Sequence, residues 1–131
     1  LIMTRDKDLF ACINDRVSVF HRDQEQYHYF DENGCIEKFG VHPKRMTEYL
    51  SLIGDCPDNI SGVAGLGPKK AQEIIFNYDS VFDAIMDPDR LSPAIAKKLV
   101  AGRNSFNLSY QLVNLRTDLA LPGITPWRVL D

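Results

Sequence analysis

Apolar residues follow two different spacings along the chain. Over the first 30 residues they come in short runs and alternations, which favour strands. Beyond residue 40 they recur three or four positions apart, which is the period of a helix buried on one face. The pattern predicts two parts: an α/β remnant over residues 1–40, followed by an all-α subdomain over residues 41–131.

The strands of the first part can be placed from their composition. The apolar run Leu1–Thr4 resembles the carboxyl end of a buried parallel strand. Parallel strands need neighbours joined through crossover connections, so we expect this chain to be cut from a longer one. Val17–Phe20 and Tyr27–Phe30 flank a polar turn at Arg22–Gln26 and predict a hairpin.

Capping residues and prolines mark the helices. Asp31 is a candidate N-cap, Gly40 and Gly54 are stop signals, and Pro43 and Pro68 suit the first turn of a helix. These signals predict helices over about residues 8–13, 32–39, 43–53, 68–77 and 81–86, one that begins at Ser92-Pro93, a last one through Leu108, Leu112, Val113 and Leu115, and a loop from Leu121 onwards.

Composition restricts the classes of function. The hydrophobic fraction of 44% over 131 residues suits one compact soluble unit, and no apolar run reaches the roughly 20 residues of a membrane-spanning helix. Without a signal for export, we expect a cytoplasmic protein with no membrane partner. The net charge of −3 argues against indiscriminate DNA binding, so any contact with nucleic acid must be local.

The cysteines and histidines show no metal-binding spacing. Neither a C-x-x-C pair nor an H-x-x-x-H or H-E-x-x-H motif is present, which favours reduced thiols and exposed or loop histidines. The residues concerned are Cys12, Cys35, Cys56, His21, His28 and His42.

Residues 62–70, GVAGLGPKK, combine glycines with a proline and two lysines. Gly65 and Gly67 permit a tight turn, Leu66 can anchor it in the core, and the following helix begins with free N–H groups. Those N–H groups, beside Lys69 and Lys70, predict an anion site for a phosphate. The alternative is a plain turn with solvated lysines. The spacing matches neither a P-loop nor a Rossmann motif.

The turn also offers carbonyl groups. Outward-pointing carbonyls of Val63 and Leu66 would suit a monovalent cation such as K⁺, which would offset the charge of a bound phosphate.

Four aspartates precede the turn. Asp6 and Asp8 follow the predicted parallel strand, where open α/β sheets bind their ligands, and Asp55 and Asp58 lie in the loop before the turn. Such carboxylates could hold two Mg²⁺ or Mn²⁺ ions ~4 Å apart across a phosphodiester. Alternatively, Asp6 caps a helix and Asp58 with Asn59 builds a turn.

Together these motifs resemble the 5′-nuclease family, including the 5′→3′ exonuclease domain at the front of bacterial DNA polymerase I. The likeness keeps the order of the motifs over nearly the whole chain. It rests on residues 4–9 (TRDKDL), 49–59 (YLSLIGDCPDN), 62–71 (GVAGLGPKKA) and 116–119 (RTDL).

The resemblance implies a metal-dependent enzyme that cleaves DNA at 5′ ends and flaps, with a PIN-like α/β core and a helix-hairpin-helix (H3TH) that holds the duplex. Asp6, Asp8, Asp55 and Asp58 match the metal-associated carboxylates, and Asp6 and Asp58 are expected to approach the metal most closely. The hairpin residues that match are Gly65, Gly67, Lys69 and Lys70.

The family also places carboxylates on an early strand and an acidic helix, and it carries a basic arch, none of which occurs here. The chain therefore resembles the second half of the nuclease domain. We expect weak DNA binding and no cleavage unless the missing half is supplied, and a polymerase domain is a further possible partner. The alternative functions are a non-catalytic helix-hairpin-helix module and a protein-interaction domain.

Overall fold

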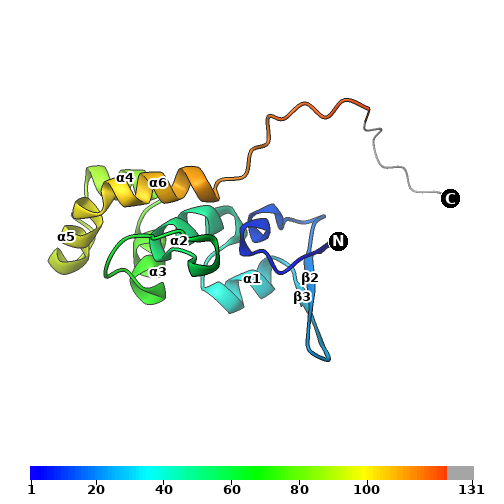
Figure 1. Ribbon diagram of the computed structural model, residues 1–131. Helices are drawn as coiled ribbons and strands as arrows, with labels where there is room; N and C mark the ends of the chain where they lie inside the picture. The colour runs from blue at the N-terminus through cyan, green and yellow to red at the C-terminus, as the bar shows by residue number, and fades with distance from the viewer. Residues whose placement is uncertain (124–131) are drawn as a thin grey trace.

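A computed structural model of the chain describes residues 1–123. A small sheet lies at one end of the molecule and a helical array forms the rest (Figure 1). The sheet has the order β1-β2-β3, with β1 (Ile2–Met3) parallel to β2 (Val19–Asp23) and β2 antiparallel to β3 (Gln26–Phe30). The predicted hairpin is confirmed, and its turn is tighter than expected because pairing continues to Asp23 and Gln26.

The first strand is parallel, as predicted, but it is not buried. Met3 is 76% exposed, and its partners across the sheet, Phe20 on β2 and Tyr29 on β3, lie on the same face. Tyr29 is also largely exposed, so that face is open to solvent in the described part of the chain. An apolar run indicates a strand that tends to be buried, but it does not supply the layer that would cover it.

Helices occur where the caps and prolines predict them, except that one predicted helix is divided in two. The predicted helix over residues 43–53 begins as a 3₁₀ turn, and the first predicted helix is 3₁₀ throughout. The elements are the 3₁₀ helices η1 (Lys7–Cys12), η2 (Pro43–Arg45) and η3 (Cys56–Asp58), and the α-helices α1 (Glu32–Phe39), α2 (Met46–Ile53), α3 (Pro68–Asn77), α4 (Val81–Met86), α5 (Pro93–Ala101) and α6 (Arg103–Val113).

Local chemistry explains the ends of α1. The Asp31 carboxylate accepts a hydrogen bond of 2.8 Å from the backbone N–H of Gly34. Gly40 ends the helix with φ = 73°, and a Cβ atom at this position would lie 2.6 Å from the Gln72 side chain. Both end residues therefore behave as the sequence predicts.

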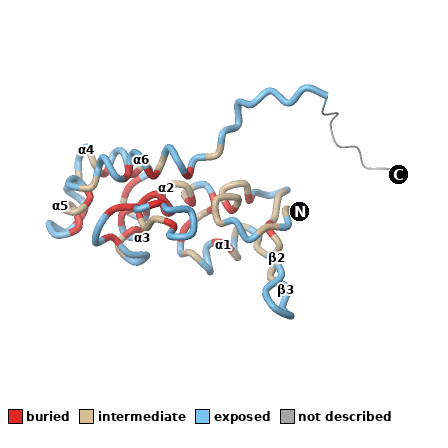
Figure 2. The backbone as a smooth tube through the Cα atoms, in the orientation of Figure 1, coloured by how far each residue is buried: buried red, intermediate tan, exposed pale blue. Residues whose placement is uncertain are grey.

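Helix α2 is the centre of the core. It packs against α3, α6 and η1, and Figure 2 shows the buried backbone concentrated around α2 and α3. One cluster of buried side chains joins the sheet to the helices, so the division at residue 40 stays a prediction. Its largest fully buried members include Phe10, Val19, Met46, Leu50, Leu52, Ile74, Leu99 and Phe106.

Helix α6 was expected through Leu108, Leu112, Val113 and Leu115, but of these only Val113 is buried, and Leu115 lies beyond the end of the helix. Phe106, Ser109 and Val113 are buried, whereas Leu108 and Leu112 are exposed. The chain then runs without regular structure from Asn114 to Gly123, in agreement with the predicted loop as far as it is described. The rest of that predicted loop lies outside the described residues.

Membrane insertion has no support from the helices. Among residues 1–123, no helix combines the length and the apolar character needed to cross a bilayer.

Candidate metal and nucleic-acid site

Three carboxylates from two distant segments come together at the end of β1. Asp6 caps η1, and its carboxylate accepts a 3.0 Å hydrogen bond from the backbone N–H of Asp8. Asp58 is the last residue of η3. One carboxylate oxygen from each of the three residues lies within 4.8 Å of the others, which is a spacing that one cation can bridge.

Asp8 is the electrostatically strained member of the group. Its pKa is raised from 3.8 to about 6, first by burial and then by the negative charges of Asp6, Asp58 and Asp55. Its Oδ1 atom is buried and has no hydrogen-bond partner among the described residues. A divalent cation would both satisfy this oxygen and offset the repulsion, so the residues present fit a metal.

Asp55 lies beside this group but is held differently. It is only 4% exposed, and its Oδ1 atom accepts a hydrogen bond of 3.0 Å from the Lys7 ammonium group. Its backbone N–H also donates to the Ile60 carbonyl at 2.8 Å. The structure thus brings Asp55 to the site as an ion pair, outside the set of three oxygens. An open pocket lies beside Asp55 and is lined by Arg5, Asp6, Lys7, Asp55, Pro57 and Asp58.

Two glycines fold the loop that carries Asp55 and Asp58. Gly54 has φ = 79° and Gly62 has φ = 66°. They lie back to back, because a Cβ atom on Gly62 would be 2.4 Å from the backbone nitrogen of Gly54. The Gly62 N–H donates to the Ser109 hydroxyl of α6 at 3.2 Å. The loop position therefore depends on side chains smaller than a methyl group.

Asp6 and Asp58 also have the structural roles considered as alternatives to metal binding. Asp6 is the N-cap of η1, and Asp58 ends a 3₁₀ turn that Asn59 completes with φ = 56°. These roles leave carboxylate oxygens free for a cation. A structural role and a ligand role are therefore compatible in both residues.

The glycine turn before α3 has the predicted shape. Leu66 is 4% exposed and anchors the turn in the core, and Gly65 has φ = 79°. Gly67 precedes α3 without a side-chain cap, and no heavy atom lies within 4 Å of where its Cβ would be. The first intrahelical bond runs from Ala71 N–H to the Gly67 carbonyl, so the backbone N–H groups of Lys69 and Lys70 precede the first bond of α3, as at any helix start.

Two carbonyl groups of the turn already accept hydrogen bonds from nearby residues. The Val63 carbonyl accepts the Leu66 N–H at 3.2 Å, and the Gly65 carbonyl accepts the Lys70 ammonium group at 3.2 Å. A cation at Val63 and Leu66 would have to use the remaining lone pairs. This site stays a prediction.

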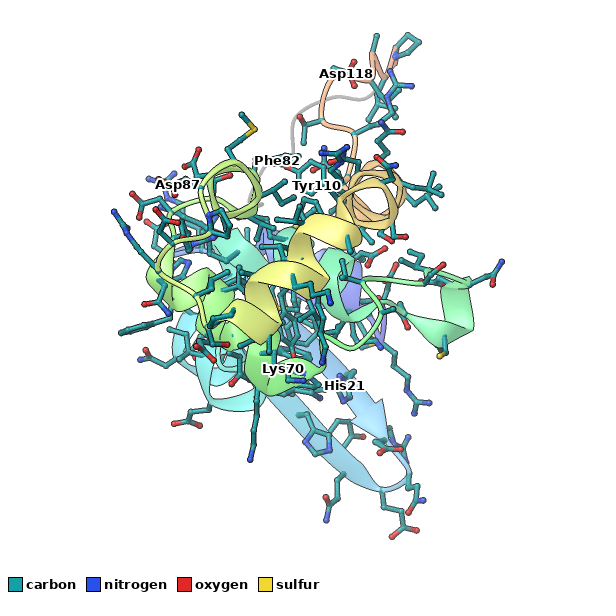
Figure 3. The ribbon with its side chains drawn as sticks, turned by 90° about the vertical axis from the view of Figure 1, so that its left-hand side faces the viewer. His21, Lys70, Phe82, Asp87, Tyr110 and Asp118 are labelled. Carbon is teal, nitrogen blue, oxygen red and sulfur yellow. The ribbon has the colours of Figure 1, made fainter. Side chains whose placement is uncertain are left out.

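Sequence reasoning missed Lys98 of α5. A Cβ atom on Gly65 would lie 3.0 Å from the Lys98 Cδ atom, so this side chain lies over the turn. The pKa of Lys98 is lowered, first by its side-chain contact with Lys70 and then by the charge of that residue. Lys70, labelled in Figure 3, therefore belongs to a pair of ammonium groups at the turn. Such a pair is electrostatically suited to an anion.

Comparisons with known proteins point in one direction. Residues 41–127 match the family described as 5′-3′ exonuclease, C-terminal SAM fold. The chain is 38% identical to flap endonuclease Xni of Pseudoalteromonas translucida over 121 residues, which are 92% of this chain and 46% of that protein. It is 36% identical to thermostable DNA polymerase I of Thermus aquaticus over 120 residues, which are 92% of this chain and 14% of that protein.

Solved structures show the same fold. The 5′-exonuclease of bacteriophage T5 with bound zinc superposes with a TM-score of 0.72 at 25% identity, over 85% of this chain and 41% of that one. A T5 flap endonuclease in a pseudo-enzyme–product complex with DNA and metal ions gives a TM-score of 0.73 at 23% identity, with the same coverage. The chain thus spans less than half the length of these relatives.

Proposed function

The chain belongs to the 5′-3′ exonuclease family, and from that premise we propose that it is part of a metal-dependent nuclease that hydrolyses DNA phosphodiesters at 5′ ends and flaps. The observation that carries the proposal is the convergence of Asp6, Asp8 and Asp58 within 4.8 Å. Two segments far apart in sequence supply these residues. A purely structural cap or turn would need no third carboxylate beside it.

The proposed metal ligands are the oxygens of Asp6, Asp8 and Asp58. Mg²⁺ and Mn²⁺ fit this donor set, since both prefer hard oxygen ligands and keep several bound waters. Bound there, such ions supply a nucleophilic water at neutral pH and stabilise the leaving oxygen. The ion pair with Lys7 satisfies the buried Asp55 carboxylate, which would also be a ligand for a second ion.

The proposed DNA contact is the turn formed by Gly65 and Gly67 with Lys69 and Lys70, to which we add Lys98. Open space at Gly67 lets a phosphate approach the N–H groups of α3. Lys70 and Lys98 add positive charge from two helices. This grip recognises the sugar–phosphate backbone and no base sequence.

We further propose two partners of the site. One is a monovalent cation, K⁺ in the cell, on the carbonyls of Val63 and Leu66. The other is the remainder of the nuclease domain, which would cover the open sheet face of Met3, Phe20 and Tyr29 and supply further acidic ligands. Neither catalysis nor tight DNA binding is expected before that remainder is present.

The test uses the full-length protein and a 5′-flap DNA substrate. Asp58→Asn is expected to abolish Mn²⁺-dependent cleavage while flap binding persists, because one of the converging oxygens becomes a neutral amide. Lys69→Ala with Lys70→Ala is expected to weaken binding and reduce its salt dependence. Cleavage at the wild-type rate by Asp58→Asn would refute the proposed ligand set, and flap binding by the wild-type protein without any cleavage would favour a non-catalytic DNA-binding module. Unchanged DNA affinity of the lysine variant would refute the grip.

A further inference from the structure

His21 and His28 face each other on the β2–β3 hairpin. They are directly paired across the two strands, with ring centroids 5.1 Å apart and planes inclined at 47°. His21 is labelled in Figure 3, on the part of the hairpin nearest the helices. Phe30 lies on the same face, and the centroid of its ring is 5.3 Å from that of the His21 ring. Two imidazoles and an apolar neighbour thus form a small cluster.

The separation of the rings suits a shared ion. With metal–nitrogen bonds of about 2.0–2.1 Å, two imidazoles that ligate one tetrahedral ion have ring centres roughly 5 Å apart. The strand register holds the two residues opposite each other, since pairing extends from Val19 with Phe30 to Asp23 with Gln26. Val19 is fully buried and fixes that register in the core. The rings therefore need little rearrangement to converge.

The protonation state also favours ligation. The pKa of His21 is lowered, first by burial and then by the charges of Lys38, His28 and Arg5, while Asp23 acts in the opposite direction. A neutral imidazole is the form that binds a metal. The Nδ1 atom of His21 is buried and has no hydrogen-bond partner among the described residues. A polar nitrogen in that condition is stabilised by gaining a partner.

We propose that His21 and His28 form a second metal site, which takes a borderline divalent transition metal such as Zn²⁺, Ni²⁺ or Cu²⁺, with water in the other positions. Imidazole nitrogen selects these ions over Mg²⁺ and Mn²⁺, whose ligands are oxygens. The site does not depend on the proposed nuclease function. The positive charges of Lys38 and Arg5 oppose a cation and weaken the site.

Calorimetric titration of the chain with Ni²⁺ at pH 7.5 tests the site. Wild-type protein is expected to bind Ni²⁺ at the hairpin with micromolar affinity, and His21→Gln and His28→Gln are each expected to weaken this binding at least roughly tenfold, because one imidazole then remains. His42→Gln is the matched control, since His42 lies at the start of η2 with its side chain turned to the Lys44 N–H. It should bind as the wild type does.

Two outcomes would overturn the site: equal affinity of the wild type and both hairpin variants, or wild-type binding only at millimolar Ni²⁺. Proton NMR provides the second measurement. Substoichiometric Ni²⁺ should broaden the His21 and His28 ring signals before that of His42. Circular dichroism checks that each variant is folded.

Discussion

Replacing Gly62 with alanine tests how the acid-bearing loop is built. The substitution adds one methyl group to a residue with φ = 66°. Its Cβ atom would lie 2.4 Å from the Gly54 nitrogen and 2.6 Å from the Leu52 carbonyl oxygen. Both contacts are with backbone, so neither can be relieved by a side-chain rotation. The loop or α2 must move.

The cost follows from two contributions. An alanine in a left-handed conformation costs about 1–2 kcal/mol, and overpacking a tight site costs about 1–3 kcal/mol. Displacement also endangers the 2.8 Å hydrogen bond from Val63 N–H to the Leu52 carbonyl. Together these effects should lower the free energy of unfolding by about 2–5 kcal/mol, against a total of about 5–15 kcal/mol for a domain.

Urea denaturation at constant m-value measures this loss, with Gly67→Ala as the control. Gly67 has φ = −86°, and no heavy atom lies within 4 Å of its Cβ position. The free energy of unfolding of Gly67→Ala should differ from that of the wild type by less than about 1 kcal/mol in either direction. Equal midpoints for the two variants would refute the reasoning, since they would show that the close approach of Gly54 and Gly62 does not constrain the fold.

Four more outcomes can be checked. Lys7→Met should cost about 1–3 kcal/mol in urea denaturation, because the buried Asp55 carboxylate loses its cation while Lys7 is partly exposed, and adding Asp55→Asn should restore most of it. Lys98→Ala should weaken flap binding by the full-length protein and lower the salt slope by about one unit; an equal effect of Lys97→Ala would contradict the assignment. Asp8→Asn should stabilise the metal-free chain at pH 7, because the folded pKa of about 6 exceeds the unfolded value of 3.8. The gain should fade as the pH falls through that interval, and urea midpoints from pH 7 to pH 3.5 decide the matter. A thiol reagent should label exposed Cys56 at once and Cys35 only on unfolding, since burial raises the Cys35 pKa to about 11; mass spectrometry after brief labelling would show early Cys35 modification if this is wrong.

The sequence predicted those features that depend on neighbouring residues. Asp31, Gly40 and Pro68 mark helix ends because their caps and fixed dihedral angles act within a few residues. The acidic motifs predicted which carboxylates to examine, and the structure brings three of the four within reach of one ion.

Features that depend on tertiary packing escaped prediction. Lys7 and Asp55 form their ion pair 48 positions apart, and Lys98 reaches the glycine turn from another helix. The periodicity of α6 identified a helix but not its inner face. Ser109 is buried there because its hydroxyl binds the Gly62 N–H, which a hydrophobicity pattern cannot reveal.

The bond from Gly62 to Ser109 has a consequence for the order of events during translation. A nascent chain that has emerged only as far as α5 lacks the hydroxyl that holds the loop and the helix that packs on α2. Asp58 would then be tethered to an unfinished scaffold. We therefore expect the carboxylates to come together only after the ribosome has released α6, and incomplete polypeptides to lack an organised metal site.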